Sequence, residues 1–170
     1  MPGGARDKPI MSGDLAIIWH SRTGAAKAMA ESLCSGAGAR AVLIPAERAT
    51  PNLLGHAAGF VFVCPENLGS MSGPMKDMFD RCYYPLLGQV EGRGYATVIA
   101  AGSDGKGAEA QIDRIVTGWR MKRIAPPLIA NLQAQTAEAI LSAKTVAVST
   151  LDKCKDLGLS LTEGVRMGIY

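Results

Sequence analysis

The sequence predicts an α/β fold in which a five-stranded parallel sheet is covered by helices on both faces. Apolar runs of strand length alternate along the chain with stretches that repeat apolar residues every three or four positions. Strands that alternate with helices imply parallel pairing through right-handed crossover connections. With 170 residues, of which 48% are hydrophobic and 19% are charged, the chain is long enough to bury such a core as one domain.

Five apolar segments are the expected strands of this sheet. They lie at about 14–19, 40–44, 59–64, 94–101 and 123–130. Uninterrupted apolar runs of this length suit strands that are buried on both faces. Pro126 and Pro127 interrupt the last segment and cannot donate backbone hydrogen bonds, so we expect an edge strand there and a long irregular loop within residues 121–149.

Four segments with helical periodicity lie between and after these strands. They are found at 24–35, from Pro74 onward, at 107–120 and at about 150–167. Pro74 suits the first turn of the second helix, because a proline there removes no helical hydrogen bond. Ser149 or Thr150 is expected to cap the last helix, since a hydroxyl at that position can accept a free backbone N–H.

The composition limits the domain organisation and the partners. The first dozen residues carry Gly, Pro and mixed charge without the apolar core of a signal peptide, so we expect a flexible segment (1–12) before one domain (13–170). The four cysteines form no CxxC pair and have no histidine at ligand spacing, which we interpret as reduced thiols in a cytoplasmic protein without a metal. The net charge of +3 is scattered, and no apolar run reaches the roughly 18 residues of a membrane span, so neither a nucleic acid nor a membrane is an expected partner.

The most informative stretch follows the first strand. Ser21-Arg22-Thr23-Gly24 ends an apolar run, and an alanine-rich helical pattern begins at once with Ala25 and Ala26. The free backbone N–H groups and the positive end of the helix dipole make such a helix start a phosphate site, and Ser21 and Thr23 add hydroxyl donors. The alternative is that Ser or Thr serves only as an ordinary helix cap.

Two further loops follow the third and fourth strands, over residues 65–73 and 102–107. In a doubly wound sheet the carboxyl ends of the first, third and fourth strands lie side by side, so all three loops converge on one cleft. Their glycines allow the backbone to approach a flat ligand closely. A flat ring between two such loops, with its phosphate at the first helix, describes flavin mononucleotide (FMN). For either loop alone, the alternative is that Gly, Ser and Pro simply form turns.

The candidate cofactor-binding residues come from these three loops. They are Ser21, Arg22, Thr23, Gly24, Ala25, Ala26, Pro65, Glu66, Asn67, Leu68, Gly69, Ser70, Met71, Gly102, Ser103, Asp104 and Gly105. Met71 is expected to contact the ligand, whereas His20 is expected to be structural or to make a minor ligand contact rather than to act as a general base. No catalytic side chain is required, because a bound flavin carries the redox chemistry itself.

Several of these motifs resemble those of a known superfamily. His20-Ser21-Arg22-Thr23-Gly24 is similar to an S-x-T-G phosphate loop, Gly69 to Lys76 with Asp80 resembles a quinone-reductase pattern, and Pro65-Glu66 resembles the start of the same loop in small FMN reductases. The chain thus resembles the flavodoxin-like superfamily, specifically its NAD(P)H-dependent FMN and quinone reductases, over nearly all of residues 14–170. The resemblance implies a flavodoxin-like three-layer sandwich, FMN as cofactor, NAD(P)H as co-substrate, a quinone or similar small acceptor, and a homodimer.

The chain also departs from that family's pattern. Ala26 stands where the phosphate loop usually has a further Thr, and Asn67-Leu68 stand where FMN reductases carry Tyr-Asn. Neither of the two ring-flanking loops contains an aromatic residue, and an uncovered ring favours a reductase, which needs access for hydride transfer.

Three alternatives to a reductase exist for such a sequence. A flavodoxin-type electron carrier stays open, although such carriers are usually strongly acidic and this chain is not. A flavin-free member of the superfamily also stays open. A signalling receiver domain is disfavoured, because Cys64-Pro65 and Trp19-His20 occupy the places where it would need acidic residues.

Overall fold

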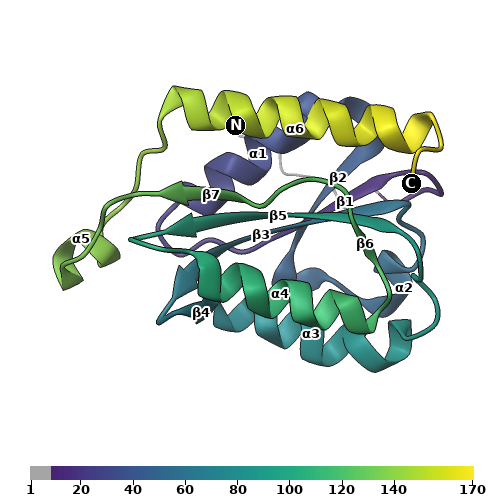
Figure 1. Ribbon diagram of the computed structural model, residues 1–170, viewed down its shortest axis with the longest axis horizontal. Coiled ribbons are helices and arrows are strands. Elements are labelled where there is room, and N and C mark those ends of the chain that lie inside the picture. The colour runs from purple at the N-terminus through teal and green to yellow at the C-terminus, as the bar shows by residue number, and fades with distance from the viewer. Residues whose placement is uncertain (1–8) are drawn as a thin grey trace.

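A parallel sheet runs through the middle of the computed structural model, which describes residues 9–170 (Figure 1). Its central strands lie in the order β2-β1-β3-β5, and β6 and β7 both pair with β5 at the far edge. The strands are β1 (Leu15–Trp19), β2 (Ala41–Pro45), β3 (Gly59–Asn67), β5 (Gly94–Ala101), β6 (Lys122–Arg123) and β7 (Leu128–Asn131). This order confirms the predicted doubly wound arrangement, with β1 and β3 at the switch point.

The predicted fifth strand is split into two pieces. β6 pairs with the beginning of β5 and β7 pairs with its end, while Pro126 and Pro127 lie between them. Proline has no N–H to give to a ladder, so the interruption falls where the sequence has two of them. A further short strand, β4 (Ser70–Met71), pairs antiparallel with the end of β3. The described chain therefore has seven strands, although the sheet has the five positions that were predicted.

Helices cover both faces of the sheet (Figure 1). α1 (Ala25–Ala37) and α6 (Val148–Arg166) lie on one face, and α3 (Gly73–Leu86) and α4 (Lys106–Gly118) lie on the other. Two short helices, α2 (Pro51–Leu54) and α5 (Ala137–Leu141), lie in connections, as do the 3-10 turns η1 (Gly38–Arg40) and η2 (Ala46–Arg48). α1 and α6 approach closely at Gly158, where an added Cβ would lie 2.0 Å from the carbonyl oxygen of Leu33.

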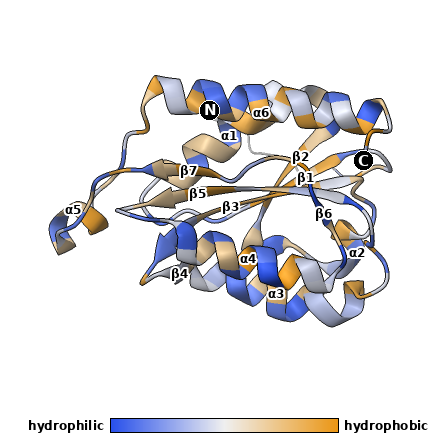
Figure 2. Cartoon of the chain, viewed as in Figure 1, coloured by the Kyte–Doolittle hydropathy of each residue, from blue (hydrophilic) through white to orange (hydrophobic). Residues whose placement is uncertain are grey.

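The side chains of each strand alternate between two cores. Ile17 of β1 and Val61 of β3 pack against α1 and α6, whereas Ile18 and Phe62 pack against α3 and α4. Figure 2 shows the resulting apolar strands between helices whose outward faces are polar. No helix in the described part of the chain is both long and apolar enough to cross a membrane.

Three details differ from the sequence-based expectations. α6 begins at Val148 after Ala147 with no side-chain cap, so the prediction that Ser149 or Thr150 caps this helix is wrong: both lie inside its first turn. The loop expected within residues 121–149 contains α5, which is capped by the Thr136 hydroxyl. Residues 1–8 of the expected flexible segment lie outside the described residues, while Ile10 is buried in the core.

Candidate functional site

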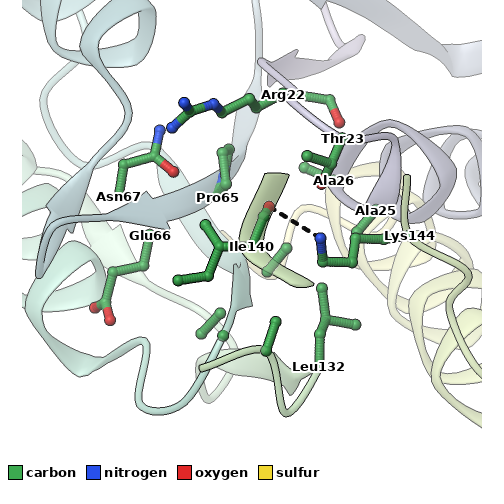
Figure 3. A pocket seen from close by; sticks show the side chains of 15 residues that line it. Arg22, Thr23, Ala25, Ala26, Pro65, Glu66, Asn67, Leu132, Ile140 and Lys144 are labelled. Atoms are coloured by element: carbon green, nitrogen blue, oxygen red, sulfur yellow. Dashed lines mark hydrogen bonds between the residues drawn. The ribbon is translucent and has the colours of Figure 1, made fainter. Parts of the chain in front are cut away.

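A pocket opens at the edge of the sheet where β1, β3 and β5 end (Figure 3). Its walls come from the start of α1, the last residues of β3 and β5, and the segment that follows β7. The lining residues are Ser21, Arg22, Thr23, Ala25, Ala26, Pro65, Glu66, Asn67, Ala100, Ala101, Gly102, Leu132, Ala134, Ile140 and Lys144. The centre of a water-sized sphere can occupy about 40 Å³ of this pocket. That is room for a few water molecules, so a larger ligand requires part of the wall to move outward.

The start of α1 is free of side-chain caps. Gly24 precedes the helix with φ +99°, a left-handed conformation that favours glycine, and no side chain bonds to the helix start. The Ser21 hydroxyl instead accepts the N–H of Gly24 at 3.1 Å, which shapes the loop before the helix. The ordinary-cap alternative is therefore wrong, and with no acidic residue in its first turn the helix presents unpaired N–H groups at the pocket.

Glu66 reaches the start of α4 rather than the centre of the pocket. Its carboxylate accepts the N–H of Gly105 at 2.9 Å and that of Ala108 at 3.0 Å. These bonds satisfy free donors of the helix start and neutralise part of the carboxylate's charge. In Figure 3 the carboxylate points away from Thr23 and Lys144. Glu66 therefore fastens the end of β3 to α4.

Residues 67–70 form a tight hairpin rather than an open loop. Leu68 and Gly69 both have positive φ, at +53° and +73°, as a two-residue type I′ turn requires, and Asn67 pairs with Ser70 across it. The Ser70 hydroxyl and the Met71 N–H both donate to the side-chain oxygen of Gln111 in α4. The hairpin is therefore tied to α4, and the side chain of Leu68 is fully exposed at its tip.

Met71 does not offer its side chain to the pocket. The side chain is only 3% exposed and belongs to the core cluster between the sheet and α3 and α4. The expected side-chain contact of Met71 with a ligand is contradicted by this burial, because alternation along the short strand β4 turns Met71 inward and Ser70 outward.

The loop after β5 is held by the segment that follows β7. Gly102 lies so close to this segment that an added Cβ would be 2.5 Å from the carbonyl oxygen of Ala134. Asn131 donates its side-chain amide to the carbonyl oxygen of Ser103 at 2.7 Å. Gly105, with φ +86°, begins α4 and packs on Ile129, so its lack of a side chain serves the fold rather than a ligand.

Two cations lie at the pocket. Arg22 is exposed, and its side chain and that of Asn67 point toward one another in Figure 3. Lys144 is half-buried, and its backbone N–H donates to the carbonyl oxygen of Thr23 at 2.9 Å. Since the carboxylate of Glu66 is already bound by α4, the charges that face the pocket favour an anion.

His20 lies at the rim of this region, just before the phosphate-loop candidate. Its Nδ1 lies 2.9 Å from the Ser72 hydroxyl and its Nε2 lies 4.0 Å from the carboxylate of Glu47. Burial lowers the pKa of His20, and Glu47 opposes this effect only in part. Burial also raises the pKa of the neighbouring Cys64 thiol to about 12, so Cys64 is no nucleophile at neutral pH.

The structure brings together residues from all three predicted loops. Ser21, Arg22, Thr23, Ala25, Ala26, Pro65, Glu66, Asn67 and Gly102 line the pocket. Gly24, Leu68, Gly69, Ser70, Met71, Ser103, Asp104 and Gly105 are neighbours that support these loops without lining it. Sequence reasoning missed six lining residues: Ala100 and Ala101 at the end of a predicted strand, and Leu132, Ala134, Ile140 and Lys144 from a segment without periodicity.

Solved structures share this fold over most of the chain. A flavodoxin from the domain Archaea matches with a TM-score of 0.71 and 19% identity, covering 90% of this chain and 99% of that one. A flavodoxin, WrbA-like protein from Agrobacterium tumefaciens matches with a TM-score of 0.73 and 16% identity, covering 92% and 99%. At these identities the similarity establishes the flavodoxin-like fold alone.

Comparisons of sequence are more specific. A flavodoxin from Aquifex aeolicus (strain VF5) is 31% identical over 109 residues, which span 62% of this chain and 59% of that protein. The profile of the NADPH-dependent FMN reductase family matches residues 21–147, from the loop before α1 to the segment before α6. Because this match covers more than half of the chain and includes all three loops of the pocket, the chain belongs to the NADPH-dependent FMN reductase family.

Proposed function

We propose that this protein binds FMN in the pocket at the ends of β1, β3 and β5 and transfers reducing equivalents from NAD(P)H to a quinone or similar small acceptor. The observation that carries the proposal is the uncapped start of α1 inside that pocket. A helix start with free N–H groups and no acidic residue favours a phosphate group. Membership of the FMN reductase family makes the phosphate of FMN the natural candidate.

The donors at this end of the pocket suit a phosphate monoester. The Thr23 hydroxyl and the N–H groups at the start of α1 are neutral donors, and Arg22 and Lys144 are cations at the same pocket. Hydrogen bonds to a charged phosphate are shorter and stronger than those between neutral groups. These residues would therefore hold and orient the phosphate end.

The other end of the pocket suits a flat ring. Ala100, Ala101 and Gly102 at the end of β5 have small side chains or none, and Pro65 at the end of β3 is apolar, so a ring would fit between them once the segment after β7 moves outward. None of the described lining residues is aromatic, so none of them would stack on the ring. When bound, FMN supplies the capacity to accept a hydride and to pass electrons on. An uncovered ring face leaves NAD(P)H and then an acceptor access to the same place.

Steady-state kinetics with added FMN test the proposal. Under anaerobic conditions the FMN-loaded protein should turn over NADPH or NADH continuously only when a small quinone is present, and double-reciprocal plots at several quinone concentrations should be parallel. A double variant, Ser21→Ala with Thr23→Ala, should need more FMN to reach the same rate, whereas Ser35→Ala with Ser149→Ala, on exposed helix faces, should not.

The other outcomes separate the alternatives. A protein that binds FMN but accepts electrons only from a separate reductase is an electron carrier, as the similarity to the Aquifex flavodoxin allows. A protein that binds neither FMN nor riboflavin contradicts the proposal at its first step.

A further inference from the structure

The segment between β7 and α6 forms part of the wall of the pocket. Its first part is fastened to the end of β5, because the N–H groups of Leu132 and Ala134 donate to the carbonyl oxygens of Ala101 and Gly102. Its last part is fastened to the loop before α1 through the bond from the Lys144 N–H to Thr23. We call residues 132–144 the strap. It supplies four of the pocket's lining residues and leaves little free space beneath it.

Within the strap, the Lys144 ammonium closes the end of α5. Its Nζ donates to the carbonyl oxygens of Ala139, Ile140 and Ser142, and Figure 3 shows the bond to Ile140. All three partners are neutral. Among residues 9–170 the structure gives Lys144 no carboxylate partner, so its positive charge at the pocket is not balanced by an acid.

The start of α1, beside Lys144, has no hydroxyl in its first turn. Ala26 stands in the first turn of α1 where the family's phosphate loop usually offers a hydroxyl, and the Ala26 side chain is buried against the core. A phosphate there would meet backbone N–H groups and the Thr23 hydroxyl, with the backbone of Lys144 already bonded to Thr23. A lysine stem is long and flexible, so its ammonium can exchange carbonyl partners for a nearby anion.

We propose that Lys144 is a phosphate-binding residue of this site: on ligand binding its ammonium leaves the carbonyls of α5 and pairs with the phosphate of FMN, in place of the hydroxyl that Ala26 lacks. This inference rests on the proposed function. Release of the ammonium frees α5 and Ile140 to move outward, which gives a ring the room that the closed strap withholds. Lys144 thereby couples opening of the pocket to recognition of an anionic ligand.

Titrations with FMN and riboflavin test this role, because the two flavins differ only in the phosphate. Lys144→Gln removes the charge and keeps most of the side chain, Lys144→Arg keeps the charge, and Lys153→Gln removes an exposed lysine of α6 that does not line the pocket. Flavin fluorescence reports each dissociation constant. Lys144→Gln should weaken FMN about 10- to 100-fold and leave riboflavin within about twofold, because a bond to a charged group is lost. Lys144→Arg should recover most of the FMN affinity, and Lys153→Gln should match the wild type.

The outcomes separate this inference from the proposed function. If the wild type binds FMN but Lys144→Gln binds it equally well, the role of Lys144 is wrong and the FMN site stands. If Lys144→Gln weakens FMN and riboflavin equally, Lys144 only supports the strap, and the inference is overturned. If the wild type binds neither flavin, the proposed function fails together with the inference.

Discussion

His20 links the loop before α1 to the residue that precedes α3. Its imidazole bonds to the Ser72 hydroxyl, which is completely buried, and its other nitrogen faces Glu47. The carbonyl oxygen of Val63 also accepts the N–H of His20, so both the backbone and the side chain of this residue are fixed. These contacts fit the structural role expected from the sequence. They also place a titratable group next to the phosphate end of the pocket.

We expect His20 to make folding stability sensitive to mild acid. Burial lowers its pKa in the folded state below the ordinary value of 6.5, so the unfolded chain binds the proton more tightly than the folded chain does. The contribution of His20 is complete above pH 6.5 and is lost as the pH falls from there through the lower pKa of the folded state. Urea unfolding at about pH 7.5 and about pH 5.5 should show a larger loss of unfolding free energy for the wild type than for His20→Gln.

His56 provides the matched control, because it is exposed on the turn before β3. His56→Gln controls for the replacement of one histidine by glutamine elsewhere on the chain. If His20→Gln and the wild type lose the same unfolding free energy between the two pH values, the expectation that buried His20 makes stability depend on pH is wrong.

At the scale of elements, the end of β3, the hairpin and α4 behave as one unit. Glu66 bonds to the start of α4, and Gln111 of α4 bonds to the hairpin. α4 also approaches the hairpin closely, because a Cβ added to Gly107 would lie 2.1 Å from the carbonyl oxygen of Gly69. Two of the three predicted loops are thus joined by α4. The end of β3 is therefore tied to α4 by several hydrogen bonds, whereas the strap is bonded to β5 and to the loop before α1 near its two ends.

Replacement of Glu66 tests this unit. Glu66→Ala removes the acceptor of two N–H groups at the start of α4 and should lower the unfolding free energy by about 1–2 kcal/mol, the range known for helix caps. Glu31→Ala, on the exposed face of α1 with only an i,i+4 lysine pair, should cost less than about 0.5 kcal/mol. Urea denaturation measures both. Equal midpoints for Glu66→Ala and the wild type would contradict the assignment of Glu66 as the cap of α4.

The sequence predicted the regular elements better than the connections. The positions of β1, β3 and β5 follow from apolar runs, and Pro126 with Pro127 correctly predicted a weak edge strand. The cap of α6 was predicted wrongly, because this helix begins at Val148 without a side-chain cap and includes Ser149 and Thr150 in its first turn. The sequence did not predict that Ile140 and Lys144 of the strap line the pocket, because their segment has no periodicity from which its course could be inferred.

The sequence predicted some residues of the candidate site well and others poorly. Residues that directly follow a strand, such as Ser21 and Gly102, reach the pocket as predicted from topology. The side chains of Glu66 and Met71 point away from the centre of the pocket for local reasons that the sequence does not reveal. The carboxylate of Glu66 accepts N–H groups at the start of α4, and alternation in β4 buries the thioether of Met71. Both residues belong to motifs that resemble those of the family. The motifs therefore predicted where the loop lies, but not which way each side chain points.

At the scale of the whole molecule, the fold gathers one end of the sheet into the proposed anion site. The carboxyl ends of β1, β3 and β5 meet there, the start of α1 faces the pocket, and the strap brings a lysine across it. Of the residues that line the pocket, Ala25, Ala26, Ala100 and Leu132 also pack in the cores that hold α1 and α4 in place. The site therefore depends on backbone placement more than on reactive side chains, as suits a protein whose cofactor carries the chemistry.

The central claim is that FMN binds with its phosphate at the start of α1. Backbone amide NMR of the protein, titrated in parallel with FMN and with riboflavin, tests this claim most directly. Both flavins should shift the amides of Ala100, Ala101 and Gly102, whereas only FMN should strongly shift those of Gly24, Ala25 and Ala26, because their N–H groups would bond to the phosphate. The account is contradicted if FMN leaves the amides of residues 24–26 unmoved, or if FMN and riboflavin shift them equally.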